Sequence, residues 1–150
     1  MAGFKRFEEI EAWKLGRELN RQIYALSAGG AFGRDFALRD QIRRAAISLS
    51  SNVAEGYARR SPKDFARFLV IARASSAEVV SQLYLALDLG YISEDEFRET
   101  RRLADRAGAA CSGLIRYLRG SPSFVREPEA EWDLDLPADE PRTLNPEPTK

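Results

Sequence analysis

The sequence predicts an all-α fold, an antiparallel up-down four-helix bundle with an extended C-terminal tail. Three observations support this prediction. Apolar residues recur at helical spacing in four long stretches of residues 1–120, short turns containing Gly, Ser or Pro separate these stretches, and no stretch alternates as a strand does. Because the connections are only a few residues long, neighbouring helices are expected to run antiparallel.

The first helix is expected from about Phe7 to Ser27. Two apolar stripes lie side by side on it, and the first is imperfect. The first stripe comprises Ile10, Trp13, Arg17, Asn20 and Tyr24, and the second comprises Ala12, Gly16, Leu19, Ile23 and Leu26. Gly29 and Gly30 are expected to end the helix, because glycine accepts the left-handed conformation of a C-terminal cap. Phe7 and Trp13 are expected in the core rather than on a base-stacking surface.

The second helix is expected from about Phe36 to Arg59, with Asp35 as its N-cap. It carries a clean amphipathic face. That face comprises Leu38, Ile42, Ala45, Leu49, Val53 and Tyr57. Ser61 and Pro62 then break the helix, because proline cannot continue it.

The third helix is expected to begin with Ser61 as N-cap and Pro62 at its first position, and to reach Leu89 with Gly90 as cap. Its inner stripe comprises Phe65, Phe68, Leu69, Ala72, Val79, Leu83 and Ala86. Further apolar residues extend beyond that stripe, and a helix that is apolar most of the way round is buried on several sides. The sequence therefore predicts a cyclic homo-oligomer whose interface contains Val70, Ile71, Tyr84 and Leu85.

The fourth helix is expected to begin after Ser93, which forms a capping box with Glu96, and to end at Gly120. The acidic residues of its first turn face the positive end of the helix dipole. Its inner face comprises Phe97, Ala104, Cys111, Ile115 and Leu118. Cys111 is expected to behave there as a small apolar residue.

The composition argues against most catalytic chemistry. The 150 residues include no histidine, which removes the commonest general base and the commonest metal ligand. Glu8, Glu9 and Glu11 project in different directions, so no metal site is expected. We expect no enzyme activity and no cofactor; an enzyme using Glu55 with an arginine is the least favoured alternative. The single cysteine and the lack of a signal peptide or an apolar run of membrane length favour the cytoplasm and no membrane contact.

The net charge of zero hides a segregation of charge along the chain. Residues 1–120 contain 20 basic and 15 acidic residues, whereas residues 121–150 contain 3 basic and 8 acidic residues and six of the seven prolines. Proline removes backbone donors and the acidic residues repel one another, so residues 121–150 are expected to form a tail without regular structure. Residues 1–120 are expected to form the bundle domain.

Four basic residues surround the turn between the second and third helices. Arg59, Arg60, Lys63 and Arg67 can neutralise phosphates, and a ring would repeat the cluster in every subunit. The alternative is a solvated turn in which Arg67 pairs with Asp64. A second basic group on the fourth helix comprises Arg98, Arg101, Arg102 and Arg106. Acidic residues interleave with this group, which is typical of an exposed helix face.

A polar group lies inside the second helix at Asn52, Glu55 and Gly56. One interpretation is a functional polar site. The favoured interpretation is structural, with Gly56 admitting a neighbouring backbone while Asn52 and Glu55 hydrogen-bond across helices. A buried carboxylate needs a donor. Candidate donors to Glu55 are Arg43, Arg73 and the amide of Gln41.

Five segments of the chain resemble one known family. They are FEEIEAW at Phe7–Trp13, the pair Ile23 and Tyr24, LRDQIRRAAISLSSNVAEGYARRS at Leu38–Ser61, FARFLVIARASSAE at Phe65–Glu78 and QLYLALDLGYIS at Gln82–Ser93. On these residues the chain resembles the 23S rRNA intervening-sequence protein family over about 1–120. The resemblance implies a small bacterial four-helix bundle without an established reaction, assembled as a ring-like homo-oligomer with five subunits favoured. Similar bundles accompany reverse transcriptases and are thought to bind nucleic acid.

The expected function is therefore nucleic-acid binding, RNA more than DNA, by a homo-oligomer. The alternative is a protein-interaction scaffold, such as an accessory subunit of a reverse transcriptase. The acidic tail residues are expected to shield the basic patches weakly. They are Glu127, Glu129, Glu131, Asp133, Asp135, Asp139 and Glu140. Other interpretations of the tail are a solubilising segment, or one whose WDLDL sequence at Trp132–Leu136 docks on a partner.

Overall fold

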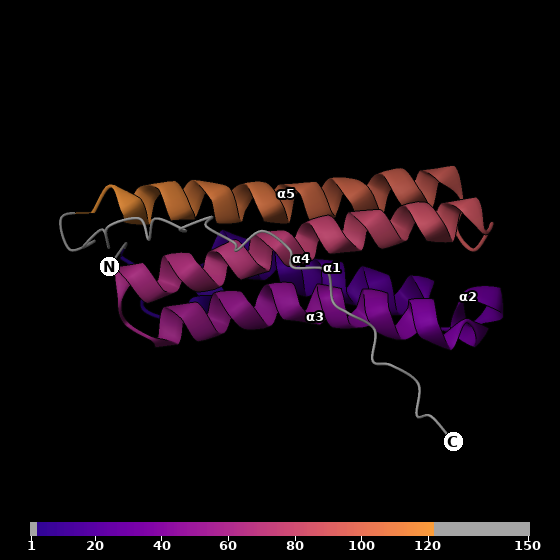
Figure 1. Ribbon diagram of the computed structural model, residues 1–150, viewed down its shortest axis with the longest axis horizontal. Coiled ribbons are helices and arrows are strands. Elements are labelled where there is room, and N and C mark those ends of the chain that lie inside the picture. Colours follow the sequence, from indigo (N-terminus) through magenta and orange to yellow (C-terminus); the bar gives the residue numbers. More distant parts are fainter. Residues whose placement is uncertain (1–2, 122–150) are drawn as a thin grey trace, which may run out of the picture.

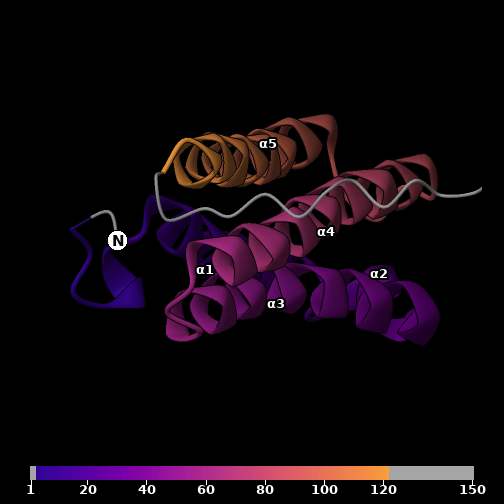
Figure 2. The same cartoon turned by 60° about the vertical axis from the view of Figure 1, so that its left-hand side comes forward.

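Four long helices pack as an antiparallel up-down bundle in the computed structural model, which describes residues 3–121 (Figures 1 and 2). The elements are the 3-10 helix η1 (Phe7–Glu9), α1 (Glu11–Leu26), α2 (Gly30–Arg34), α3 (Phe36–Ala58), α4 (Pro62–Asp88) and α5 (Glu94–Arg119). Within residues 3–121 there is no strand. The predicted fold class is confirmed. Of the predicted tail, everything after Ser121 lies outside the described residues, including WDLDL and the acidic positions.

Each long helix contacts two others, so the bundle closes on itself. The α1 helix packs on α3 and α5, and α4 packs on the same two helices from the other side. The inner faces predicted for α3, α4 and α5 are buried, apart from Tyr57 and Phe68, which are half-buried. On α1 the second stripe faces the core, whereas Tyr24 of the first stripe is exposed. Trp13 is half-buried against the edge of Phe7, with ring centroids 5.2 Å apart.

The helix starts follow the capping residues expected from the sequence. Asp35 accepts a hydrogen bond from the Leu38 amide at 3.1 Å, and Ser61 accepts one from the Asp64 amide at 3.4 Å. Ser93 and Glu96 form the predicted capping box. Asp35 has a second role, because its other oxygen accepts from the Tyr91 hydroxyl at 2.9 Å. This hydrogen bond raises the pKa of Tyr91 and ties the α4–α5 connection to the start of α3.

The sequence prediction is wrong about the start of the first helix and about the residues that cap its end. Ile10 is extended, so the 3-10 helix at Phe7 is separate and α1 begins at Glu11. At the other end α1 stops at Leu26, where Ser27 donates to the Ile23 carbonyl at 2.7 Å and accepts from Arg43 Nε at 2.9 Å. The arginine thus holds the end of α1 against α3, two residues before the glycines.

Gly30 begins a short helix that the sequence analysis missed. Its φ is +63°, and it is the first of the five residues of α2. The helix buries Phe32, which stacks on Tyr91 with ring centroids 5.5 Å apart. One buried aromatic residue gives no periodicity, so the stretch reads as a loop in the sequence.

Three glycines allow the helices to approach closely. A Cβ atom at Gly56 would lie 2.6 Å from the Cβ of Phe68 on α4, and one at Gly16 would lie 2.8 Å from Leu49 on α3. Gly108 is as tight, because a Cβ there would lie 2.6 Å from Ser76 Oγ. Gly56 was expected to admit a neighbouring backbone. The atom that a Cβ there would meet most closely is the side-chain Cβ of Phe68, and the Phe65 carbonyl oxygen lies 3.4 Å away.

Replacing Gly56 by alanine is expected to destabilise the bundle by about 1–2 kcal/mol. Overpacking at a helix contact costs about 1–3 kcal/mol, which exceeds the gain of up to about 1 kcal/mol in helix propensity. Gly113→Ala is the matched control, because a Cβ at Gly113 meets no atom within 4 Å and only the gain in propensity remains. Urea unfolding at one protein concentration measures both variants. A Gly56→Ala protein as stable as the parent would contradict the close approach of α3 and α4.

Candidate nucleic-acid interface

The turn between α3 and α4 brings the four predicted basic residues together at one end of the bundle (Figure 1). Arg59 is the C-cap of α3, and Arg60 links it to Ser61, the N-cap of α4. Lys63 and Arg67 lie in the first two turns of α4. Lys63 is half-buried, and the three arginines are exposed.

Arg60 adopts a left-handed backbone conformation, with φ at +56°. Apart from the glycines, it is the one residue of the described chain with positive φ. A side chain in this conformation carries strain of about 1–2 kcal/mol that glycine would not have. Its backbone N–H donates to the Tyr57 carbonyl at 3.2 Å, but within residues 3–121 its guanidinium makes no hydrogen bond or ion pair. The sequence gives no signal for this strain, because arginine is not a residue that marks a left-handed turn.

Arg59 is held in place by its own surroundings. Its guanidinium pairs with Glu55 at 3.3 Å and lies 5.1 Å from the centre of the Phe68 ring. Arg67 differs, because it forms no ion pair with any residue in the described part of the chain. The alternative in which Arg67 pairs with Asp64 is therefore wrong, and the Arg67 charge is available to an anion.

The predicted cross-helix hydrogen bonds of Asn52 and Glu55 are wrong. Asn52 Nδ2 donates to the Ser48 carbonyl at 2.7 Å and to Ser48 Oγ at 3.0 Å, within its own helix. Glu55 is exposed and pairs with Arg59, not with Arg43, Arg73 or Gln41. For Glu55 the reason is helix geometry. Gly56 faces α4, and the adjacent position 55 lies about 100° away round the helix, on the exposed side. The link between α3 and α4 is made instead by Ser75 Oγ, which donates to Ser48 Oγ at 2.9 Å.

Two further arginines lie at the same end of the bundle. Arg73 of α4 donates to Ser112 of α5 at 3.5 Å, so the antiparallel pairing places the last turns of α5 beside the first turns of α4 (Figure 1). Arg116 and Arg119 occupy that part of α5 and are exposed. Together with the four basic residues of the turn, they form a surface that we call the basic end. It comprises Arg59, Arg60, Lys63, Arg67, Arg116 and Arg119.

The N-terminal segment reaches the basic end and adds charges of both signs. Tyr57 donates its hydroxyl to the Phe4 carbonyl at 2.7 Å, which fixes the segment beside the end of α3. Lys5 and Arg6 follow Phe4, and Glu8 and Glu9 come shortly after them. These four charges offset one another, so the basic character of this end rests on the turn and on α5.

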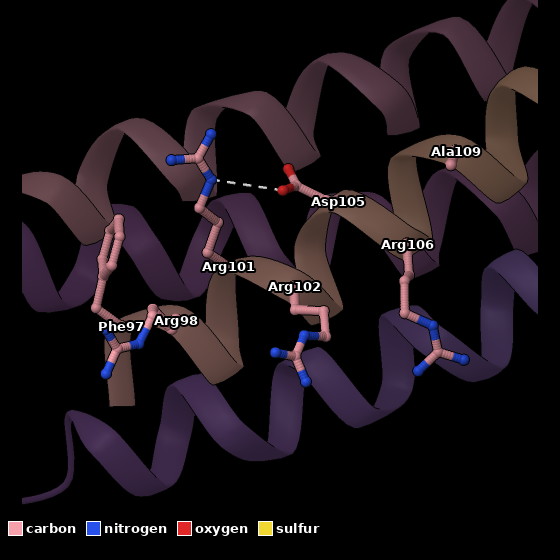
Figure 3. Close-up of a pocket in the computed structure, with 7 residues that line it drawn as sticks. All are labelled: Phe97, Arg98, Arg101, Arg102, Asp105, Arg106 and Ala109. Carbon is pink, nitrogen blue, oxygen red and sulfur yellow. Dashed lines mark ion pairs between the residues drawn. The ribbon is translucent and has the colours of Figure 1, made fainter. Parts of the chain in front are cut away.

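A second basic feature is a shallow groove along the outward side of α5 (Figure 3). We call it the α5 arginine groove. It is lined by Phe97, Arg98, Arg101, Arg102, Asp105, Arg106 and Ala109. Arg101 pairs with Asp105 at 3.4 Å and donates to the Tyr84 hydroxyl, and Arg98 pairs with Asp95 at 2.5 Å. Neither Arg102 nor Arg106 has an ion-pair partner within residues 3–121.

The apolar residues predicted for an oligomer interface lie mostly on the surface of the chain. Ile71 is 46 % exposed, Tyr84 44 % and Leu85 47 %, and Val70 is half-buried. Tyr84 is partly covered by α5, because its ring centroid lies 4.8 Å from that of Phe97. Leu89, 49 % exposed, continues the apolar surface beyond the end of α4. The interface itself stays a prediction.

Other chemistry finds little support in the described part of the chain. No group of three or more Cys, Asp or Glu side chains there could hold a metal ion, and none of its helices is long and apolar enough to cross a membrane. Cys111 is buried, and burial raises its thiol pKa to about 11. The thiol therefore stays protonated at neutral pH, where it is a poor nucleophile.

Comparisons with known proteins agree with this architecture. A family described as 23S rRNA-intervening sequence protein matches residues 8–113. The chain is also similar to a crystal structure of a protein of unknown function from the S23 ribosomal protein family of Bacteroides thetaiotaomicron. The TM-score is 0.64 at 20 % identity, covering 70 % of this chain and 98 % of that one. At this identity the likeness concerns the fold alone. The search of curated proteins found no match.

Proposed function

Because the chain belongs to the 23S rRNA-intervening sequence protein family, we propose that it is a non-enzymatic, homo-oligomeric bundle that binds nucleic acid through its basic end. RNA is the favoured ligand, since the family name refers to ribosomal RNA. The guanidinium and ammonium groups of the basic end are expected to bind phosphate oxygens of the nucleic acid. Such contacts do not depend on the nucleotide sequence.

The observation that carries the proposal is the conformation of Arg60. A left-handed turn between two helices is a position for glycine, yet this chain places an exposed arginine there at a cost in stability. Strained backbone of this kind clusters at functional sites. Arg67 and Arg116 are exposed at the same end, and neither forms an ion pair within the described residues. Arg60, Arg67 and Arg116 thus present three guanidinium groups that have no ion-pair partner within the described residues and can bind an anion.

A homo-oligomer would repeat this surface once per subunit. A single cluster of this size gives weak binding, but each additional phosphate contact releases further counterions and increases the affinity. With the five subunits that the family resemblance favours, the basic ends act together on one long nucleic acid, so the effective concentration at each further site is high.

Titration of a labelled RNA hairpin with the full-length protein at several salt concentrations tests the proposal. The logarithm of the association constant is expected to fall linearly with the logarithm of the salt concentration, by about 0.7–0.9 for each phosphate contact. A DNA duplex of the same length is the comparison, and tighter binding of the RNA would support RNA as the favoured ligand. Absence of binding to either ligand at low salt would overturn the proposed function.

A further inference from the structure

The α5 arginine groove has a surplus of unpaired charge and an apolar residue at each end. Arg102 and Arg106 extend to the side of α5 opposite Arg101 and Asp105 (Figure 3), and neither has an ion-pair partner in the described region. Glu99 forms no ion pair within residues 3–121 either, so the free charges on this face are two positive and one negative. Phe97 and Ala109 lie at the two ends of the groove.

This pattern suits a short acidic peptide better than a phosphate backbone. Asp95, Glu99 and Asp105 interleave with the arginines and would repel a continuous row of phosphates. A peptide can instead place individual carboxylates at the free guanidiniums, and apolar side chains at the ends of the groove or on the aliphatic stems of its arginines. The groove therefore fits a ligand in which acidic and apolar residues alternate.

We propose that the occupant is the segment Trp132–Leu136 of the same chain. Its sequence WDLDL alternates, so in an extended peptide Asp133 and Asp135 lie on one side and the apolar residues on the other. The two carboxylates are then about 7 Å apart along the strand. Arg102 and Arg106 are four residues apart, which is about 6 Å along α5. One carboxylate pairs with each guanidinium.

The length of the chain permits this contact. Trp132 follows Ser121 by eleven residues, which span up to about 36 Å when extended. Arg106 lies about 22 Å, and Arg102 about 28 Å, back along α5 from Ser121. The five-residue segment, about 17 Å long when extended, also matches the groove from Phe97 to Ala109, about 18 Å along the helix. A tether of this kind gives a millimolar effective concentration, so even a weak affinity keeps the groove occupied.

Fluorescence of Trp132 tests the docking without any nucleic acid. In full-length protein carrying Trp13→Phe, Trp132 is the single tryptophan. Adding Arg102→Glu and Arg106→Glu is expected to raise the acrylamide quenching constant of Trp132 by about twofold or more. Docking shields Trp132 from acrylamide for more than half of the time, and the two substitutions release the segment. Arg34→Glu with Arg44→Glu is the control with the same change in charge, and it should leave the quenching constant unchanged. The circular dichroism spectrum should show equal helix content in all variants.

Two results would overturn the proposal. One is equal quenching with the intact and the reversed groove. The other comes from mixed assemblies of two variants. One variant has the reversed groove and keeps Trp132, and the second has an intact groove and no tryptophan. If Trp132 is protected from acrylamide in the mixture, the segment docks on a second copy and not on its own chain. Reversal of the tail charges, Asp133→Arg with Asp135→Arg, should restore protection in the chain with the reversed groove. Failure of that rescue would also count against the pairing.

Discussion

The variant with Arg59, Arg60 and Lys63 replaced by alanine is expected to bind the RNA hairpin about tenfold or more weakly at low salt. The slope of the salt dependence should also fall by about one for every phosphate that the variant no longer binds. The substitutions are repeated in every subunit, so the effect on an oligomer exceeds that on a single chain. Titrations of parent and variant at several salt concentrations measure both quantities. Equal affinity and equal slope would show that the turn does not touch the nucleic acid.

Two controls separate this result from a general decrease in charge or in structure. Arg21→Ala, Arg34→Ala and Arg44→Ala together remove the same charge from exposed positions away from the basic end, and this variant should bind nearly as the parent does. Arg60→Gly removes one guanidinium and also relieves the left-handed strain. It is expected to unfold at a higher urea concentration than the parent and yet to bind RNA more weakly, a combination that a purely structural role for Arg60 does not produce.

Replacing Ile71 and Leu85 together by aspartate is expected to dissociate the oligomer into monomers. Both side chains are nearly half exposed in the single chain, and an interface that covers them would bury two unpaired carboxylates in every subunit. Light scattering should give a mass near the 16.9 kDa of one chain for the variant, and a mass several times larger, with five chains favoured, for the parent. Tyr117→Asp is the control, because Tyr117 is 59 % exposed but lies on α5, outside the predicted interface. A monomeric parent at micromolar concentration would refute the predicted assembly.

The bundle was predictable because its signals are local or periodic. Asp35, Ser61 and Ser93 cap helices through hydrogen bonds to backbone amides three residues away, so their roles depend on nearby sequence alone. The buried faces of α3, α4 and α5 follow the helical period over many turns, so the side of each helix that faces the core can be identified from the sequence. On α1 two stripes compete, and the choice between them depends on which neighbours approach, through Gly16 and Ser27 for example.

The candidate site was predictable only in part, since it depends on contacts between distant residues. The basic turn is contiguous in sequence and was found there. The antiparallel direction of α5 is predictable, but its register along α4 is not. That register, seen in the contact between Arg73 and Ser112, brings Arg116 and Arg119 level with the turn. Which side of α3 faces α4 depends on the contact at Gly56, and Glu55 lies on the exposed side next to it. The strain at Arg60 depends on the geometry of the whole turn.

Photo-crosslinking of a labelled RNA to the full-length protein, followed by mass spectrometry of the crosslinked peptides, tests the central claim most directly. The account predicts adducts on the peptides that contain the α3–α4 turn, Arg59 to Arg67, and on the last turn of α5 around Arg116 and Arg119. Irradiation at high salt should give far fewer of these adducts, because salt weakens the phosphate contacts that bring the RNA to these peptides. Adducts confined to the α5 arginine groove or to the outer face of α1 would contradict the assignment of the basic end as the nucleic-acid interface.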